Sequence, residues 1–368
     1  MSQRFEFANS LRGIACISVL IAHFGLTFWT SPSAISSLLN LEALSVNLPE
    51  RLEPLIFSPN FGYGSFGVAL FFVISGFVIP ISLERQSFIS FLVSRVVRIF
   101  PVYIVSFLIG MLSIYILGSI IQDEYLFPYS INQLIVQVTL LRGYFWVPSL
   151  DGLSWTLEIE LTFYLLTAIF MSIDKVIKKR VSIKLFVVLS PLLSAVCIDA
   201  VNHTGGIVQT SLLYLSYVIP FLLFMYAGTF IYYFVTKHET FGSTVLFVFY
   251  LIWAFQVCAK AHPALSNFDF SSYLVALTIF LAFFISRDTF PKYRLLQYFA
   301  SISYPLYAVH ALLGYSLMYY FHTINVSAYY SIILTFISVL FVSIVIHKLV
   351  EKPSLRVIKF IKANSKSD

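Results

Sequence analysis

The sequence predicts an all-α, polytopic membrane protein with about ten transmembrane helices and both termini in the cytoplasm. Of its 368 residues, 59% are apolar and only 11% are charged, and the mean hydropathy is +0.88. Soluble domains carry about 25% charged residues because their surface faces water. A soluble globular protein, a disordered chain and a coiled coil are therefore excluded. An outer-membrane barrel is excluded too, because its short alternating strands do not give apolar runs of this length.

Ten apolar stretches are long enough to cross the hydrocarbon core, which takes about 20 residues of helix. Two of them, 183–200 and 271–286, are short. The segment 132–147 is also apolar but contains Arg142 and three amide side chains, so we expect an interfacial helix or an outer-loop element there. The expected spans are 11–30, 65–83, 99–121, 154–173, 183–200, 211–235, 243–260, 271–286, 299–321 and 328–350.

The distribution of positive charge predicts the orientation of these spans. If the N-terminus is cytoplasmic, only Arg51, Arg142 and Lys260 fall in outer segments, and the other 20 of the 23 Lys and Arg residues fall in inner ones. Cytoplasmic loops are rich in Lys and Arg. The asymmetry therefore supports ten spans with both termini inside. It also accounts for the net charge of +6 without a nucleic-acid partner.

The segments outside the spans predict the domain organisation. We expect one transmembrane domain over 1–352 and a short basic cytoplasmic tail over 353–368 that lies along the inner leaflet. The outer loops 31–64 and 122–153 are long, which suggests a working surface on the outer side. The three cysteines lie in apolar segments without metal-ligand spacing, so we expect buried thiols and no metal site.

Ionisable residues within the spans are functional candidates because charge is costly in hydrocarbon. Arg12 and His23 are eleven residues apart, so a helix places them on the same side, with Arg12 at the inner boundary and His23 near mid-membrane. His310 follows Pro305 and also lies near mid-membrane, whereas His347 is expected at the interface. The alternatives are a snorkelling anchor for Arg12 and packing hydrogen bonds for the histidines.

Two glutamates open the fourth span. Glu158 and Glu160 point about 200° apart on a helix, so they do not form a paired-carboxylate site. Glu160 is the deeper one and needs a partner, for which a histidine would serve. Glu158 is nearer the headgroups, where it can be solvated.

A pair of arginines precedes the third span. Arg95 and Arg98 have i,i+3 spacing, which puts both guanidiniums on one helix face and lets them grip a phosphate. The alternative is an ordinary cluster of cytoplasmic positive charge. The candidates together suggest a polar pathway through the bundle. A proton-coupled transporter would show a similar set, so charge alone leaves transport and catalysis open.

Six motifs in order, spread over nearly the whole chain, carry a resemblance. They are 11–15 leading to His23, 67–79, 95–101 with Tyr103, 153–160 with Phe163 and Tyr164, 302–307 with His310, and 351–353. With these motifs the chain resembles the bacterial membrane acyltransferases of the acyltransferase-3 family, which includes O-antigen, exopolysaccharide and Nod-factor acetylases. It departs from the family pattern at Thr156 (usually Ser), Leu161 (often Trp) and Pro305 (often Ser). None of these departures removes an ionisable group.

The resemblance implies an O-acyltransferase of the bacterial inner membrane. Such an enzyme moves an acyl group, most often acetyl, from cytoplasmic acyl-CoA to a hydroxyl of a surface or secreted glycan, without a metal. Its partners would be the bilayer and a glycan or lipid-linked glycan acceptor. On this account Arg95 and Arg98 would hold the phosphates of CoA, and Arg12 would hold the pantetheine or phosphate end.

The resemblance also implies roles for the remaining candidates. His23 would be the general base on the acceptor hydroxyl or would carry the acyl group transiently, since neutral imidazole suits either role. Glu160 would orient the imidazole, and His310 would be a further candidate for base or oxyanion donor. One alternative is a proton-coupled exporter of a glycan or lipid with His23 and Glu160 as its relay. Another is a membrane scaffold without chemistry.

Overall fold

The structure is a computed structural model that describes residues 6–47, 49, 61–289, 291 and 293–364. Over these ranges the chain is helical and contains no strand, which confirms the all-α prediction. Four residues of the charge count (Arg4, Arg51, Lys292 and Lys366) lie outside the described part. The elements are α1 (Glu6–Leu20), η2 (Ile21–Thr27), α2 (Phe28–Thr30), α3 (Pro32–Leu39), α4 (Tyr63–Glu84), α5 (Phe88–Ile121), α6 (Ile131–Val138), η4 (Arg142–Phe145), α7 (Ser154–Ile177), α8 (Ser182–Val201), α9 (Gly206–Val235), α10 (Phe241–Ala261), η5 (Pro263–Leu265), α11 (Ser271–Ile285), α12 (Arg294–Thr323), α13 (Ala328–Ile346), η6 (His347–Glu351) and α14 (Lys352–Asn364).

All ten predicted spans coincide with helices. Among the described residues, eight helices are long and apolar enough to cross a membrane, so the chain is a multi-pass membrane protein. The two others are α11, which is only 15 residues long, and α12, which has 30 residues but a more polar sequence. The count of ten and the cytoplasmic location of both termini stay predictions.

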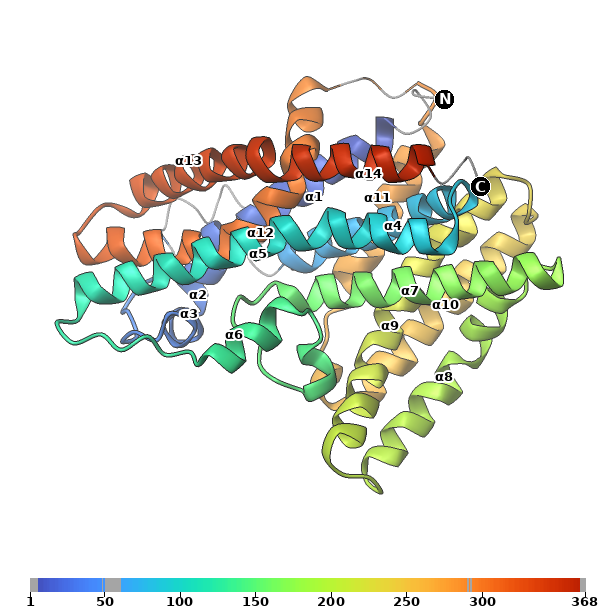
Figure 1. The fold of residues 1–368 in the computed structure, drawn as a ribbon, viewed down its shortest axis with the longest axis horizontal. Helices are drawn as coiled ribbons and strands as arrows, with labels where there is room; N and C mark the ends of the chain where they lie inside the picture. Colours follow the sequence, from blue (N-terminus) through green and yellow to red (C-terminus); the bar gives the residue numbers. More distant parts are fainter. Residues whose placement is uncertain (1–5, 48, 50–60, 290, 292, 365–368) are drawn as a thin grey trace.

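The core of the bundle is formed by α4 and α9. In the most apolar stretch of each helix, 78% of the residues of α4 and 89% of those of α9 are buried. The corresponding share is 22% for the long helix that begins with α13. A helix that is apolar on all sides can be surrounded by other helices or can face lipid. Its packing in the structure shows which of these applies. Figure 1 shows α1, α5 and α12 to one side of this centre and α8 and α10 to the other.

Small residues allow α4 and α9 to approach closely. A Cβ atom on Gly76 would overlap the carbonyl oxygen of Met225, and a Cβ on Gly228 would overlap that of Val73. The Thr229 hydroxyl donates across the same contact to the carbonyl of Gly76 at 2.9 Å. Close backbone approach and interhelical hydrogen bonds replace the hydrophobic effect where lipid surrounds a bundle.

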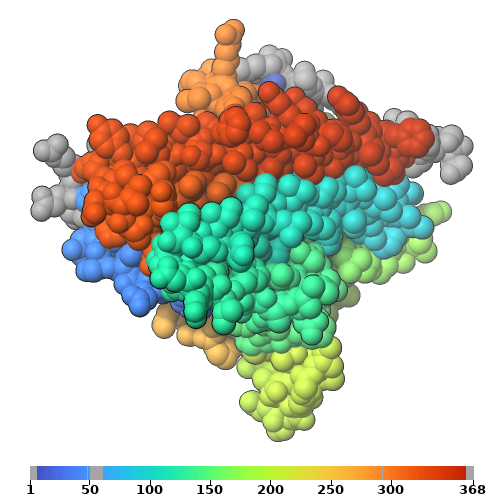
Figure 2. Space-filling view, turned by 60° about the vertical axis from the view of Figure 1, so that its left-hand side comes forward, coloured from blue at the N-terminus to red at the C-terminus, as the bar shows by residue number. Residues whose placement is uncertain are grey.

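The C-terminal segment is helical. α14 continues α13 through the π-helical turn η6, and the three make one rod, while the location of the segment after 352 along the inner leaflet stays a prediction. Figure 2 shows this rod lying beside α5 on one face of the molecule, in agreement with the contacts between α14 and α5. Pro353, which has no backbone N–H to donate, stands just after the π-helical turn within this rod.

Candidate active site

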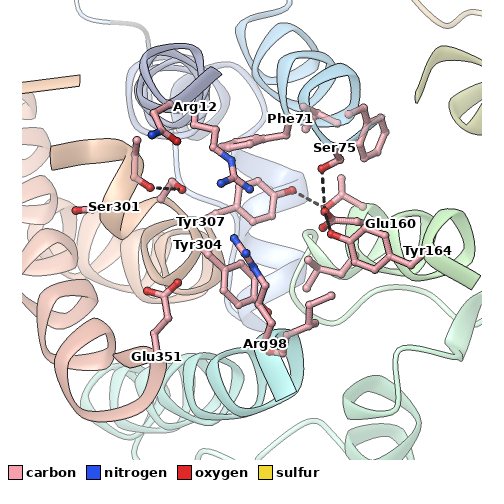
Figure 3. Close-up of a pocket in the computed structure, with 18 of the residues that line it drawn as sticks. Arg12, Phe71, Ser75, Arg98, Glu160, Tyr164, Ser301, Tyr304, Tyr307 and Glu351 are labelled. Carbon is pink, nitrogen blue, oxygen red and sulfur yellow. Dashed lines mark hydrogen bonds between the residues drawn. The ribbon is translucent and has the colours of Figure 1, made fainter. Parts of the chain in front are cut away.

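A cavity of about 340 Å³ lies between α1, α4, α5, α7, α12 and the start of α14 (Figure 3). Asn9, Gln297 and Leu355 line it from segments that the charge pattern predicts at the cytoplasmic ends of their spans. Deeper in the bundle its wall is formed by Phe72 and Tyr307. The polar residues that line it are Asn9, Arg12, Ser75, Arg98, Thr156, Glu160, Tyr164, Gln297, Ser301, Ser303, Tyr304, Tyr307 and Glu351.

Two guanidiniums enter this cavity without a protein partner. Figure 3 shows Arg12 from α1 and Arg98 from α5 pointing into it from opposite walls. Within the described part of the chain, neither side chain makes a hydrogen bond or ion pair. A partly buried guanidinium without a counter-ion is costly, and its planar fork suits a phosphate or carboxylate. The two arginines therefore make this cavity suited to an anionic ligand.

Arg95 is not at the cavity wall, which corrects the prediction that it grips a phosphate together with Arg98. Its Nη2 donates to Ser82 Oγ at 2.6 Å, and its guanidinium lies over the rings of Phe91 (4.8 Å) and Tyr164 (5.4 Å). The i,i+3 spacing puts the two arginines on one helix face but one turn apart. Because of this one-turn offset, Arg95 lies outside the cavity lining, where α5 packs against Ser82 of α4 and Tyr164 of α7.

Glu160 lies on the cavity wall, but its partners are hydroxyl groups. Ser75 Oγ donates to Glu160 Oε1 at 3.0 Å, and the Tyr164 hydroxyl donates to the same oxygen (Figure 3). Among the described residues no histidine contacts this carboxylate, so the expected histidine partner is not there. Ser75 could not be predicted as a partner, since it comes from another helix, whereas the i,i+4 spacing of Glu160 and Tyr164 on α7 was a signal for the second contact.

Glu158 is buried, contrary to the expectation that it is solvated. Its side chain is 1% exposed and its Oε1 lies 3.0 Å from Nε of Arg142. Arg142 also donates from Nη1 to the carbonyl of Val147 at 2.8 Å. The segment 132–147 forms the short helices α6 and η4, as predicted, and η4 folds over the start of α7. This fold brings an arginine assigned to the outer loop against the buried glutamate.

His23 and His310, which were each predicted near mid-membrane, are adjacent in the structure. Their ring centroids are 4.6 Å apart and the rings are nearly perpendicular, at 84°. His310 Nδ1 hydrogen-bonds to the carbonyl of Tyr307 at 2.7 Å, and His310 is fully buried. In the described structure its Nε2 has no hydrogen-bond partner. The two histidines therefore lie side by side and can be treated as one candidate site.

Tyr307 separates the histidine pair from the cavity. It lines the cavity, its ring centroid lies 5.6 Å from that of His310, and its hydroxyl hydrogen-bonds to Thr156 Oγ1 at 2.8 Å. Arg12 and His23 both face α12, as the helical spacing predicts: Arg12 at the cavity and His23 beside His310. The site is thus an anion cavity followed, deeper in the bundle, by two imidazoles.

Two polar groups near the site escaped sequence reasoning. Asp151 is buried, accepts from the Tyr103 hydroxyl at 2.8 Å and caps the start of α7 by accepting from the backbone N–H of Ser154. The signal was an aspartate three residues before a predicted helix start. Glu351, which lines the cavity, accepts from Nδ1 of His347 at 2.6 Å. His347 is thus a hydrogen-bond partner of Glu351.

Comparison with known proteins finds a family model and a curated relative that match this chain. The model of a family described as an acyltransferase domain matches residues 5–348. Nodulation protein 10 of Rhizobium leguminosarum bv. viciae is 34% identical over 113 residues, which cover 27% of this chain and 31% of that protein. The chain thus aligns with about a third of the length of this curated relative. No solved structure matches.

Proposed function

The chain belongs to the acyltransferase-3 family of bacterial membrane acyltransferases. From that premise we propose that it transfers an acyl group, acetyl in the first instance, from cytoplasmic acyl-CoA. The acceptor is a hydroxyl of a surface or secreted glycan. The observation that carries the proposal is the pair of unpartnered guanidiniums, Arg12 and Arg98, in a cavity at the predicted cytoplasmic side. CoA supplies the phosphates that such a pair binds. The acyl thioester then extends from the arginines towards Tyr307.

The histidine pair supplies the base. In the proposed step the acceptor hydroxyl loses its proton to an imidazole nitrogen, and its oxygen bonds to the acyl carbonyl carbon. The carbon–sulfur bond breaks, and the CoA thiolate leaves with the proton from the imidazolium. His23 takes the proton and His310, whose Nε2 is a free acceptor in the described structure, stands beside it as a second base. Imidazole is suited to this step because its pKa lies near neutrality.

Glu160 acts on the donor side of this proposal. It faces the same cavity as the two arginines and holds the hydroxyls of Ser75 and Tyr164. Its carboxylate offsets part of the positive charge of Arg12 and Arg98, which would bind the phosphates of CoA. The alternative of an exporter with a proton relay from His23 to Glu160 is less well supported, because these two residues have different hydrogen-bond partners.

Donor binding by the purified protein in detergent tests the proposal. We expect acetyl-CoA and CoA to bind, and dephospho-CoA, which lacks the ribose phosphate, to bind more weakly. Membranes that contain the protein should move labelled acetyl from acetyl-CoA to a lipid-linked glycan. If acetyl-CoA does not bind while a proton gradient drives glycan or lipid export, the exporter is the correct function.

A further inference from the structure

A second pocket, of about 220 Å³, lies where α4, α7 and α9 end, on the predicted cytoplasmic side. Figure 1 shows this end of α7 at the right-hand edge of the bundle. The lining of the pocket consists of Glu84, Met171, Asp174, Lys175, Lys178, Lys179, Arg180 and Tyr233. None of these residues lines the anion cavity, and along α7 Met171 lies about 16 Å beyond Glu160 by helix rise. The pocket is therefore separate from the candidate active site.

Helical spacing and a tight turn bring four basic side chains to this pocket. Lys178 lies four residues after Asp174 and three after Lys175, so all three share one face of α7. Lys178 also ends the helix with a left-handed backbone, at φ 55°. The chain turns there, and Lys179 and Arg180 line the pocket as well. The lining thus carries four cations and two carboxylates and has a net positive charge.

Both carboxylates of the pocket are held by the protein itself. Oε1 of Glu84 lies 3.0 Å from Nη2 of Arg180, and Oε2 of Glu84 accepts from the hydroxyl of Tyr232 at 2.5 Å. Oδ1 of Asp174 accepts from the backbone N–H of Ser182 at 2.9 Å, at the start of α8. In the described part of the chain, the three lysines of the pocket have no carboxylate partner. Their charge is therefore available to a ligand.

Three donors in the pocket lack a partner within the described structure. The ammonium groups of Lys178 and Lys179 make no hydrogen bond there. Tyr233 is only 2% exposed, yet its hydroxyl has no hydrogen-bond partner among the described residues. The guanidinium of Arg180 lies over the Tyr233 ring, 5.1 Å from its centroid. A buried hydroxyl without a partner is costly, so these donors suit a ligand with several acceptor oxygens.

We propose that this pocket binds a phosphate group at the cytoplasmic face of the protein. A phosphate ester is negatively charged, has several acceptor oxygens, and forms charge-assisted hydrogen bonds with ammonium groups. Its source is either the headgroup of an anionic phospholipid of the inner leaflet or a soluble phosphate ester. The bound phosphate would join the end of α7, through Lys178, to the end of α9, through Tyr233. The proposal does not rest on acyl transfer.

Thermal melting of the full-length protein in detergent tests the proposal with three probes. They are phosphatidylglycerol, phosphatidylcholine, whose headgroup has no net charge, and glycerol 3-phosphate, which has no acyl chains. A ligand that binds only the folded state raises the melting temperature as its concentration increases. We expect this rise with phosphatidylglycerol and not with phosphatidylcholine. An equal rise with glycerol 3-phosphate identifies a soluble phosphate as the ligand, and no rise with either anionic probe overturns the proposal.

Lys178→Gln combined with Lys179→Gln tests whether this pocket is the site. A lysine near an anionic lipid contributes about fivefold to affinity, so the double variant should need about 25-fold more of the active anionic probe for the same rise in melting temperature. The matched control is Lys348→Gln combined with Lys359→Gln, which removes the same charge from exposed lysines of η6 and α14. An equal loss in both double variants would indicate an ordinary cluster of cytoplasmic positive charge and would overturn the pocket.

Tyr233→Phe distinguishes a ligand donor from a packing residue. It keeps the ring beneath Arg180 and removes a hydroxyl without a partner in the described structure, so without ligand the variant should melt no lower than the parent. Its affinity for the anionic probe should fall about tenfold, because a hydrogen bond to a charged group is lost. A variant that melts lower without ligand and binds the probe as the parent does would overturn this role. Acetyl-CoA affinity should be unchanged in the double variant of Lys178 and Lys179, and its loss would assign the pocket to the donor site instead.

Discussion

Arg12 and Arg98 differ from Arg95 in what surrounds the guanidinium. The first two face the cavity without a protein partner in the described residues, whereas Arg95 is held by Ser82 and two aromatic rings. Charge-assisted hydrogen bonds contribute about 1.5–3 kcal/mol each. We therefore expect Arg98→Ala to weaken acetyl-CoA binding at least about tenfold, measured by calorimetry on the purified protein.

Arg95→Ala provides the comparison for Arg98→Ala. It removes the hydrogen bond to Ser82 and the support beneath Tyr164, so we expect a lower melting temperature and a smaller loss of donor affinity. An equal loss of affinity in both variants, with melting unchanged, would mean that Arg95 reaches the donor after all.

Substitution of the two glutamates of α7 should affect different properties, stability for Glu158 and donor binding for Glu160. Glu158→Gln leaves Arg142 without its counter-ion in a buried contact, which should cost on the order of 3 kcal/mol of stability. Glu160→Gln can still accept from Ser75 and Tyr164, so the fold should survive. Without the negative charge the cavity is more positive, and acetyl-CoA should bind about fivefold more tightly. Thermal melting and calorimetry on both variants measure the two effects.

The arginines and histidines of the site show how far individual residues could be placed from the sequence. Helical spacing predicted that Arg12 and His23 share one side of their helix, with Arg12 at the inner boundary and His23 deeper, because rise and turn angle are fixed within one helix. It could not supply partners that come from other helices. Arg95 is held by Ser82, and His23 is hydrogen-bonded to Tyr315, which is 292 residues away in the chain.

Among the elements, the crossing of α4 and α9 depends on two glycines. Gly76→Ala or Gly228→Ala would push a methyl group into the backbone of the facing helix, which can yield only by separating the helices. Core strain of this kind typically costs about 1–3 kcal/mol, so we expect lower melting temperatures and lower yields in detergent. Gly242→Ala in α10 is the control, since no described atom lies within 4 Å of a Cβ there. Equal melting of all three variants would contradict the close approach.

The helices themselves could be predicted more fully than their ends. Apolar runs predicted all ten helices, because a span in hydrocarbon must satisfy its own backbone. The start of α5 at Phe88, eleven residues before the predicted span, was missed because Arg95 and Arg98 interrupt the apolar run. The turns η2 and η6 were missed as well. A π-helical turn leaves the pattern of apolar residues almost unchanged, so that pattern does not reveal it.

For the whole molecule, charge and architecture support one orientation. The anion cavity is bordered by Asn9 near the start of α1, by Gln297 near the start of α12 and by Leu355 in α14, and the charge pattern predicts all three at the cytoplasmic side. A cytoplasmic acyl-CoA would thus meet the arginines first and the histidines deeper in the bundle. The sequence predicted the fold class and singled out three of the residues that line the cavity, Arg12, Arg98 and Glu160. The position of the cavity was not, because it depends on how six segments pack.

Reporter fusions test that orientation. If 20 of the 23 Lys and Arg residues face the cytoplasm, a fusion after Asn47 should report the outer compartment and a fusion after Lys179 the cytoplasm. The helices α4, α5 and α7 lie between these two points, and an odd number of crossings reverses the side. A reporter that fluoresces only in the cytoplasm and an enzyme active only outside should therefore give opposite signals at each position. The same compartment at both positions would mean that one of the three helices does not cross. In that case the cavity could not be assigned to the cytoplasmic side, and acyl-CoA would lose its route to Arg12 and Arg98.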